Sequence, residues 1–150
     1  MSQDMRGLDI TLKAGANLNT TTSDWQPVQI NSVMSCNIAN STTHRAIGVL
    51  QNRPNTGTGS SCQVRVLGVT KITMNDTCTA GDLIYMGTGG ARKGTGLTIT
   101  TDTQILGRAL ESAAATATVI AMFVAPEMLH LAVGFTTTAV NAGGNNIVID

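Results

Sequence analysis

Apolar and polar residues alternate with a period of two along most of the chain, which is the pattern of short β-strands. Stretches rich in Gly, Asn, Ser and Thr separate the alternating segments, as turn residues do. The predicted strands span residues 9–13, 25–30, 46–50, 62–67, 68–74, 83–86, 97–101, 105–110 and 118–124. The pattern therefore predicts an all-β protein.

Two of these segments carry more specific expectations. Trp25, Val28 and Ile30 are the expected core anchors of their strand, and Pro27 favours an edge position because it lacks a backbone donor. Residues 118–124 are almost continuously apolar, which predicts a strand buried on both faces.

The clearest helix candidate is the Ala-rich stretch at 111–117, but about seven residues are too few for an independently stable helix. We expect a turn or one short helical segment there. Beyond Pro126, residues 128–135 and 146–149 suit a last hairpin across the Gly- and Asn-rich stretch at 141–145.

The sequence around Gly48 has an internal echo around Gly107. Ile-Gly-Val-Leu at 47–50 resembles Leu-Gly-Arg-Ala-Leu at 106–110, and each is followed by a loop of small residues and an apolar strand. We expect two similar hairpins. A glycine in the first strand of each suits a bulge or a close backbone crossing, which bends sheets into small barrels.

Composition indicates one folded domain with little charged chemistry. In 150 residues, 42% are hydrophobic, 12% charged and 3% aromatic, and the formal net charge is zero. We divide the chain into an N-terminal arm (1–9), a β-domain (10–126) and a C-terminal β-hairpin extension (127–150).

Charge and apolar runs exclude several partners. The chain has no basic block, so it lacks the electrostatic footprint of a nucleic-acid-binding protein. The longest apolar run, residues 119–125, is far shorter than a membrane span, and the first ten residues lack the pattern of a signal peptide. Three widely spaced cysteines favour no disulfide framework, so we expect synthesis in a reducing cytoplasm.

No catalytic or cofactor site is predicted. The Gly-rich stretch 87–96 lacks the Gly-Lys-Ser/Thr ending of a phosphate loop. Cys36, His44 and His130 occur outside any hydrolase motif, although a small hydrolase built on Cys36 and His44 is an alternative that a structure can test.

Carboxylates and metal ligands are equally sparse. Asp76 and Asp82 are the closest internal carboxylates, and both lie in turn contexts where Asp caps backbone amides. The His and Cys residues lack zinc-ligand spacing, so we expect no metal and no cofactor.

Five segments together resemble the capsid decoration, or cement, proteins of tailed bacteriophages. The residues that carry the resemblance are 13–18, 46–54, 64–72, 80–82 and 105–111, so it covers roughly residues 10–125. The resemblance implies a compact β-barrel or β-tulip with at most one short helical segment. It also implies a homotrimer that binds the major capsid protein on the outer surface of the virion, is made in the host bacterial cytoplasm, and carries no catalytic residues.

The leading hypothesis is therefore a decoration protein that stabilises an assembled capsid. The alternative is a β-structured phage tail or host-surface binding module, which would share the Thr and Gly richness. For capsid binding we single out the N-terminal arm, whose apolar and charged residues cannot be buried by the arm alone. The candidate residues are Asp4, Met5, Arg6, Leu8, Asp9 and Ile10.

Overall fold

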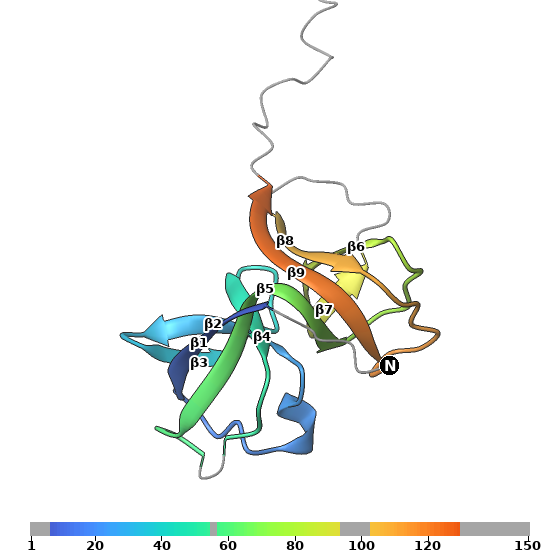
Figure 1. The fold of residues 1–150 in the computed structure, drawn as a ribbon. Coiled ribbons are helices and arrows are strands. Elements are labelled where there is room, and N and C mark those ends of the chain that lie inside the picture. Colours follow the sequence, from blue (N-terminus) through green and yellow to red (C-terminus); the bar gives the residue numbers. More distant parts are fainter. Residues whose placement is uncertain (1–6, 55–56, 94–102, 130–150) are drawn as a thin grey trace, which may run out of the picture.

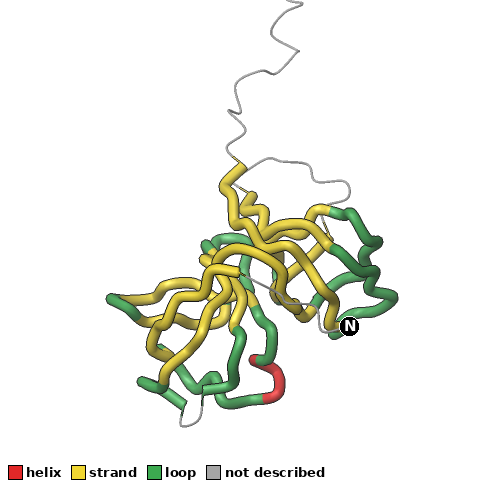
Figure 2. The backbone as a smooth tube through the Cα atoms, in the orientation of Figure 1, coloured by secondary structure: helices red, strands yellow, loops and turns green. Residues whose placement is uncertain are grey.

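The computed structural model describes residues 7–54, 57–93 and 103–129, and these form nine strands and one short 3-10 helix (Figure 1 and Figure 2). The elements are β1 (Gly7–Ala14), η1 (Thr21–Ser23), β2 (Pro27–Ser32), β3 (Ser35–Ile38), β4 (Ala46–Leu50), β5 (Ser61–Thr73), β6 (Leu83–Gly87), β7 (Gly90–Lys93), β8 (Thr103–Ala109) and β9 (Val119–Leu129). The prediction of an all-β barrel fold is confirmed. The predicted strand at 97–101 and hairpin beyond residue 129 lie outside the described residues.

The first five strands close into a barrel. Their order is β1-β3-β2-β4-β5, and β1 pairs in parallel with β3 and antiparallel with β5. Strand β5 is 13 residues long and forms one continuous strand from the two segments predicted at 62–67 and 68–74. We call this unit the first barrel.

The far half of β5 begins a second unit. Residues 68–73 of β5 pair with β9, and the order continues β9-β8-β6-β7. A parallel bridge between Met74 and Ala91, with Asn75 N–H donating to the Ala91 carbonyl at 2.8 Å, brings β7 back to the end of β5. We call this unit the second barrel. The two barrels form the two lobes in Figure 1, and β5 runs through both.

The two barrels repeat one pattern of pairing. In the first barrel, strands pair in the ring β1-β3-β2-β4-β5, and in the second, the ring is β5-β7-β6-β8-β9. Registers agree as well: Val49↔Arg65 lies beside Gly48, and Arg108↔Phe123 lies beside Gly107. Away from the bulges at Leu8/Asp9 and Ile30/Ser32, paired residues of the first barrel therefore have matched positions in the second.

Gly48 and Gly107 occupy the matched crossings, as the sequence echo predicts. A Cβ at Gly48 would lie 2.2 Å from the Arg65 carbonyl oxygen, and one at Gly107 would lie 1.9 Å from the Phe123 carbonyl oxygen. The residue before each glycine is skipped in the pairing with β2 or β6, which marks a bulge. Only glycine permits this close backbone approach, so the expectation of two similar bent hairpins is confirmed.

Each barrel encloses its own core. The first core consists of Leu12, Ala14, Leu18, Val28, Cys36, Leu50, Cys62 and Val64. The second consists of Ala39, Ala46, Val49, Ile72, Met74, Cys78, Ile84, Met86, Ala91, Leu106, Ala109, Ala113, Ile120, Met122 and Val124.

The barrels are also joined at β4. Ala46 and Val49 belong to β4 of the first barrel but are buried in the core of the second. Buried Gln104 on β8 accepts a hydrogen bond from Ala46 N–H at 2.6 Å and donates to the Ala46 carbonyl. Packing and hydrogen bonding therefore join the barrels in addition to β5.

Two expectations for β2 are wrong. Strand β2 lies between β3 and β4, so it is not an edge; Pro27 is tolerated because it is the first residue of the strand, and its carbonyl still accepts from Ala39 N–H at 2.8 Å. Val28 is fully buried as predicted and Trp25 is partly buried against the second core, but Ile30 is 52% exposed.

In the second barrel, one expectation is wrong and one is confirmed. Strand β9 is not buried on both faces: Ile120, Met122 and Val124 point into the core, whereas Val119 and Phe123 are exposed. The stretch at 111–117 is a turn, which is one of the two predicted alternatives. Its backbone groups bond to the 74–78 segment, including Ala113 N–H to the Cys78 carbonyl at 2.9 Å, which leaves no helical ladder there.

Candidate interaction surface

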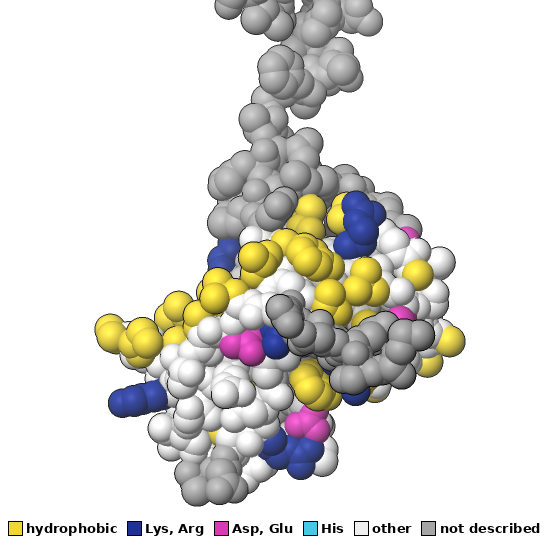
Figure 3. Space-filling model, in the orientation of Figure 1, with side chains coloured by type: hydrophobic (Ala, Val, Ile, Leu, Met, Phe, Trp, Pro, Cys, Tyr) yellow, Lys and Arg dark blue, Asp and Glu magenta, His cyan; other side chains and the backbone are white. Residues whose placement is uncertain are grey.

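A band of exposed apolar side chains crosses one face of the molecule (Figure 3). It runs from the β2–β3 hairpin, at the left, toward the strands of the second barrel. The large apolar residues exposed in the described structure are Leu8, Ile30, Val33, Met34, Leu67, Leu83, Leu110, Val119 and Phe123. Contiguous exposed apolar surface is typical of an interaction site, whereas isolated exposed residues are not informative.

One end of the band is the tip of the β2–β3 hairpin. Ser32 pairs with Ser35, so Val33 and Met34 form the two-residue turn. Val33 is 92% exposed, and Met34 has a positive φ of 55°. Hairpin turns of this length favour Gly, Asn or Asp, because a bulky side chain at positive φ is strained. The turn itself therefore does not require apolar side chains at these two positions.

The other end of the band is the outward face of β9 and its neighbours. Phe123 pairs with Val69 on β5 and with Arg108 on β8. Leu110, just past β8, donates its N–H to the Ala121 carbonyl at 2.9 Å and so lies beside β9. Between the two ends, Leu8 on β1 is paired directly with Leu67 on β5, and both are exposed.

An ion pair fastens β1 to β5. Arg65 donates from Nε and Nη2 to the Asp9 carboxylate, the latter at 3.1 Å, and from Nη1 to the Val69 carbonyl at 2.6 Å. Hydrogen bonding to Asp9 raises the pKa of Arg65, so the guanidinium is charged at any physiological pH. The pair fixes the start of β1 on β5.

The structure divides the predicted arm. Residues 7–9 belong to β1 and pair with β5, so the barrel begins before the predicted boundary at residue 10. Leu8 is exposed, Asp9 is engaged with Arg65, and Ile10 is half-buried against the first core. Asp4, Met5 and Arg6 lie outside the described residues.

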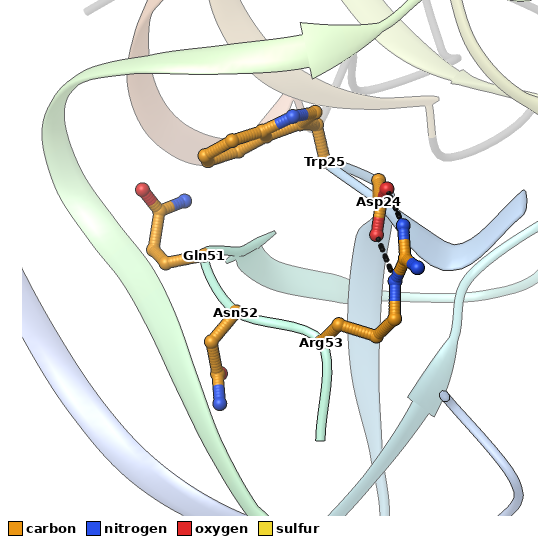
Figure 4. A pocket seen from close by; sticks show the side chains of 5 residues that line it. All are labelled: Asp24, Trp25, Gln51, Asn52 and Arg53. Carbon is orange, nitrogen blue, oxygen red and sulfur yellow. Dashed lines mark hydrogen bonds and ion pairs between the residues drawn. The ribbon is translucent and has the colours of Figure 1, made fainter. Parts of the chain in front are cut away.

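A pocket lies beside Trp25, with a volume of about 330 Å³ (Figure 4). Arg53 donates to both carboxylate oxygens of Asp24, from Nε at 3.0 Å, and this hydrogen bonding raises the pKa of Arg53. The Gln51 amide donates to the Val49 carbonyl and accepts from the Thr70 hydroxyl. These polar groups form hydrogen bonds with one another or with the barrel. The network supports the fold and is not typical of a ligand site.

Of the residues considered for catalysis, Cys36 and His44 are described, and both have structural surroundings. Cys36 is fully buried, and desolvation raises the pKa of its thiol to about 12, so it is not a nucleophile at neutral pH. The Nδ1 atom of His44 accepts from Asn40 N–H at 3.1 Å, a local turn contact. His130 lies outside the described residues. The fold thus offers no support for a hydrolase built on Cys36 and His44.

The remaining candidates have structural roles. Asp76 accepts from Thr77 N–H and Asp82 from Thr79 N–H, both at 2.8 Å, so the predicted turn-capping roles are confirmed. Of the Gly-rich stretch, residues 87–93 are described, and they continue from β6 into the strand β7. In the described ranges, no three His, Cys, Asp or Glu side chains gather as metal ligands, and no helix is long and apolar enough to cross a membrane.

Sequence reasoning missed both ends of the band. The 118–124 run looked like a doubly buried strand because hydrophobicity alone does not tell a core face from an exposed apolar face. The Ser-Val-Met-Ser turn at 32–35 carried a usable signal: two bulky apolar residues between polar ones, where a hairpin favours Gly or Asn.

Comparisons with known proteins give a family and a fold. The family described as phage cement protein matches residues 3–124. No curated protein matches the chain. Among solved structures, the chain is similar to the head fiber gp8.5 N base of bacteriophage phi29, with a TM-score of 0.51 and 14% identity over 83% of this chain and 98% of that one. At this identity the likeness concerns the fold alone.

Proposed function

The chain belongs to the phage cement protein family, and on that premise we propose that it binds the outer surface of an assembled phage capsid as a homotrimer and stabilises the shell. The family match over residues 3–124 carries the proposal. A structural role associated with the phage capsid follows from membership. The outer-surface position, the contact with the major capsid protein, the trimer and synthesis in the host cytoplasm are parts of the proposal.

The exposed apolar band supports association with other protein. Val33, Met34 and Phe123 are partly or almost fully exposed in the single chain, and covering them removes apolar surface from water. A protein that binds the assembled shell and not its separated subunits stabilises the shell by mass action. Many copies on one shell act together, so each needs only modest affinity. This mechanism requires neither a catalytic group nor a cofactor.

We propose that the segment before β1 contributes to capsid contact, with Asp4, Met5 and Arg6 as its contact residues and Leu8 at its base. Leu8 is 58% exposed, whereas Asp9 and Ile10 are held by the first barrel. Deleting residues 2–6 removes none of the described strand pairs. We expect the melting temperature to stay unchanged and binding to heads to weaken at least tenfold, which corresponds to ~1.4 kcal/mol.

The test mixes purified protein with undecorated, expanded heads and separates bound from free protein by sedimentation. We expect the full chain to sediment with the heads, and the heads to survive heating that disrupts undecorated ones. Protein that stays in the supernatant contradicts the cement function. Binding to host cells with no binding to heads would favour the tail or host-surface module instead. Equal head binding by the full and truncated chains would contradict the proposal for the arm.

A further inference from the structure

We propose that copies of this chain join head to tail, with the β2–β3 hairpin tip of one copy seated on the β9 face of the next. The hairpin tip comprises Ile30, Val33 and Met34, and the β9 face comprises Leu110, Val119 and Phe123. The inference rests on the proposed homotrimer and assigns the surfaces that form it.

The matched turns of the two barrels differ in their residues. The turn at Val33–Met34 in the first barrel corresponds to Thr88–Gly89 in the second, because Ser32↔Ser35 and Gly87↔Gly90 close the matched hairpins. In the second barrel, glycine takes the positive φ, 88°, at no steric cost. The same fold therefore accepts ordinary turn residues. Met34 at φ 55° and Val33 at 92% exposure add strain and exposed apolar surface that the barrel does not require.

The matched sheet faces of the two barrels differ in polarity. Ser61, Gln63 and Arg65 on β5 occupy the positions that Val119, Ala121 and Phe123 occupy on β9. In the first barrel this outward face is polar, and its Asp9–Arg65 ion pair corresponds to the Val69–Phe123 pair in the second. Matched strand geometry thus supports a polar face in one barrel and an apolar face in the other. The apolar face is a property of the second barrel's surface and not of the fold.

The tip and the β9 face of one chain cannot contact each other, so a second copy is the occupant. The tip and the β9 face lie in different lobes, and both are exposed, so they do not cover one another within one chain (Figure 1 and Figure 3). The β2–β3 hairpin, residues 27–38, contains no charged residue, so the tip itself brings no charge into the contact. On the β9 face, the exposed cations Arg108 and Lys71 lie opposite Phe123 and Ala121. The chain has zero formal net charge, so copies do not repel one another overall. A projecting tip and a sheet face make a heterologous contact, and repeating it around a threefold axis closes a ring.

The test uses two variants that import residues from matched positions. The tip variant is Val33→Thr with Met34→Gly, the residues of the β6–β7 turn. The face variant is Phe123→Arg with Val119→Ser, the residues of the first barrel's face. Since each residue already occurs at the matched place, we expect both variants to fold. The control is Gln63→Arg, which adds the same cation to the exposed polar face of the first barrel.

Analytical ultracentrifugation of the full chain measures the outcome. We expect the wild type and the control to be trimers, and each variant to associate ~30-fold or more weakly, as for loss of a hot spot of ~2 kcal/mol. An equimolar mixture of the two variants retains one intact tip and one intact face. That mixture should give a 1:1 dimer of twice 15.5 kDa that grows no further.

The dimer in the mixture separates this arrangement from others. Trimers of either variant, or a mixture that stays monomeric while the wild type is trimeric, would overturn the tip-to-face contact and leave the capsid function standing. A wild type that is monomeric at all concentrations would overturn the trimer itself. Head binding measured on the same samples reports separately on the cement function.

Discussion

The two barrels share a backbone plan, but the polarity of the sheet face and of the hairpin turn is reversed between them. Each has the same strand order, matching registers around the crossing and a glycine at that crossing. The first barrel has register shifts at Ile30/Ser32 and Leu8/Asp9 that the matched pairs of the second barrel lack. The first barrel has a polar sheet face and an apolar turn, and the second has an apolar sheet face and a Gly-containing turn. Positions that agree between the barrels are those that the fold constrains. Positions that differ are free of that constraint, so their residues reflect what each surface contacts.

The cores differ as well. Cys36 and Cys62 in the first barrel are matched by Ala91 and Ile120 in the second. All four side chains are buried. The repeated barrel therefore tolerates different ways of filling its interior, provided that the crossing glycine is kept.

The crossing glycines should give the largest effects on stability. We expect Gly48→Ala and Gly107→Ala each to lower the free energy of unfolding by about 3 kcal/mol, because the new Cβ would overlap a backbone carbonyl that cannot move without breaking strand pairs. Urea unfolding measures this. Because β5 and Gln104 join the barrels, either variant should lower the stability of the whole molecule in one transition.

The matched controls are Gly59→Ala and Gly81→Ala, one in each barrel. Both glycines have positive φ, 86° and 95°, and a Cβ added at either would meet nothing within 4 Å. In these control variants the free energy of unfolding should fall by about 1 kcal/mol, which is the cost of placing a side chain at positive φ. If Gly48→Ala and Gly107→Ala lower the free energy of unfolding no more than the controls do, the predicted overlap with the carbonyl is wrong. Two separate unfolding transitions would show that the barrels unfold independently.

The sequence predicted the parts of the fold that local patterns encode. The 46–50 strand, the capping of turns by Asp76 and Asp82 and the Gly48 and Gly107 crossings follow from alternation, turn chemistry and the echo between the hairpins. The closure of two barrels was not predictable in this way. It depends on the parallel pairs of β1 with β3 and of Met74 with Ala91, which join residues far apart in the chain and leave no periodic signal.

The candidate surface was predicted only in general terms. The sequence singled out the N-terminal arm for contact, and of its candidates Leu8 lies exposed on β1. Which residues are exposed depends on the direction in which each strand faces, and one register step reverses that direction. Ile30 and Phe123 were therefore assigned to the interior on hydrophobicity, although the barrels turn both of them outward.

Alkaline pH should distinguish the cores. The buried Cys36 thiol has its pKa raised from 9.0 to about 12, chiefly by desolvation, and burial also raises the pKa of Cys62. Below pH 9 the thiol is protonated in both the folded and the unfolded chain, so it contributes no pH dependence. Between pH 9 and 12 only the unfolded chain releases the proton, so the free energy of unfolding falls as pH rises, by up to ~1.4 kcal/mol per pH unit for this thiol.

Cys36→Ala, which imports the matched Ala91, should reduce this alkaline loss. The measurement is urea unfolding of wild type and variant from about pH 7 to about pH 11, in the presence of reductant. We expect the difference in stability between the two proteins to be constant up to about pH 8 and to narrow above it. If the free energies of unfolding of the two proteins fall in parallel up to about pH 11, the alkaline loss does not come from Cys36.

The smallest expected effect is a gain in stability. Val33→Thr with Met34→Gly replaces a strained turn by the type already present at Thr88–Gly89, and glycine accepts positive φ without steric cost. We expect the free energy of unfolding of the single chain to rise by about 1 kcal/mol. The reverse exchange, Thr88→Val with Gly89→Met, should lower it by at least as much, because a Cβ at Gly89 would lie 2.2 Å from Asn75 Nδ2.

The stabilities of both variants are measured at concentrations where the wild type is dissociated, since association would add its own stabilisation. A tip variant less stable than wild type would mean that Val33 and Met34 support the barrel, and the exposed turn would then be no evidence for a contact between copies.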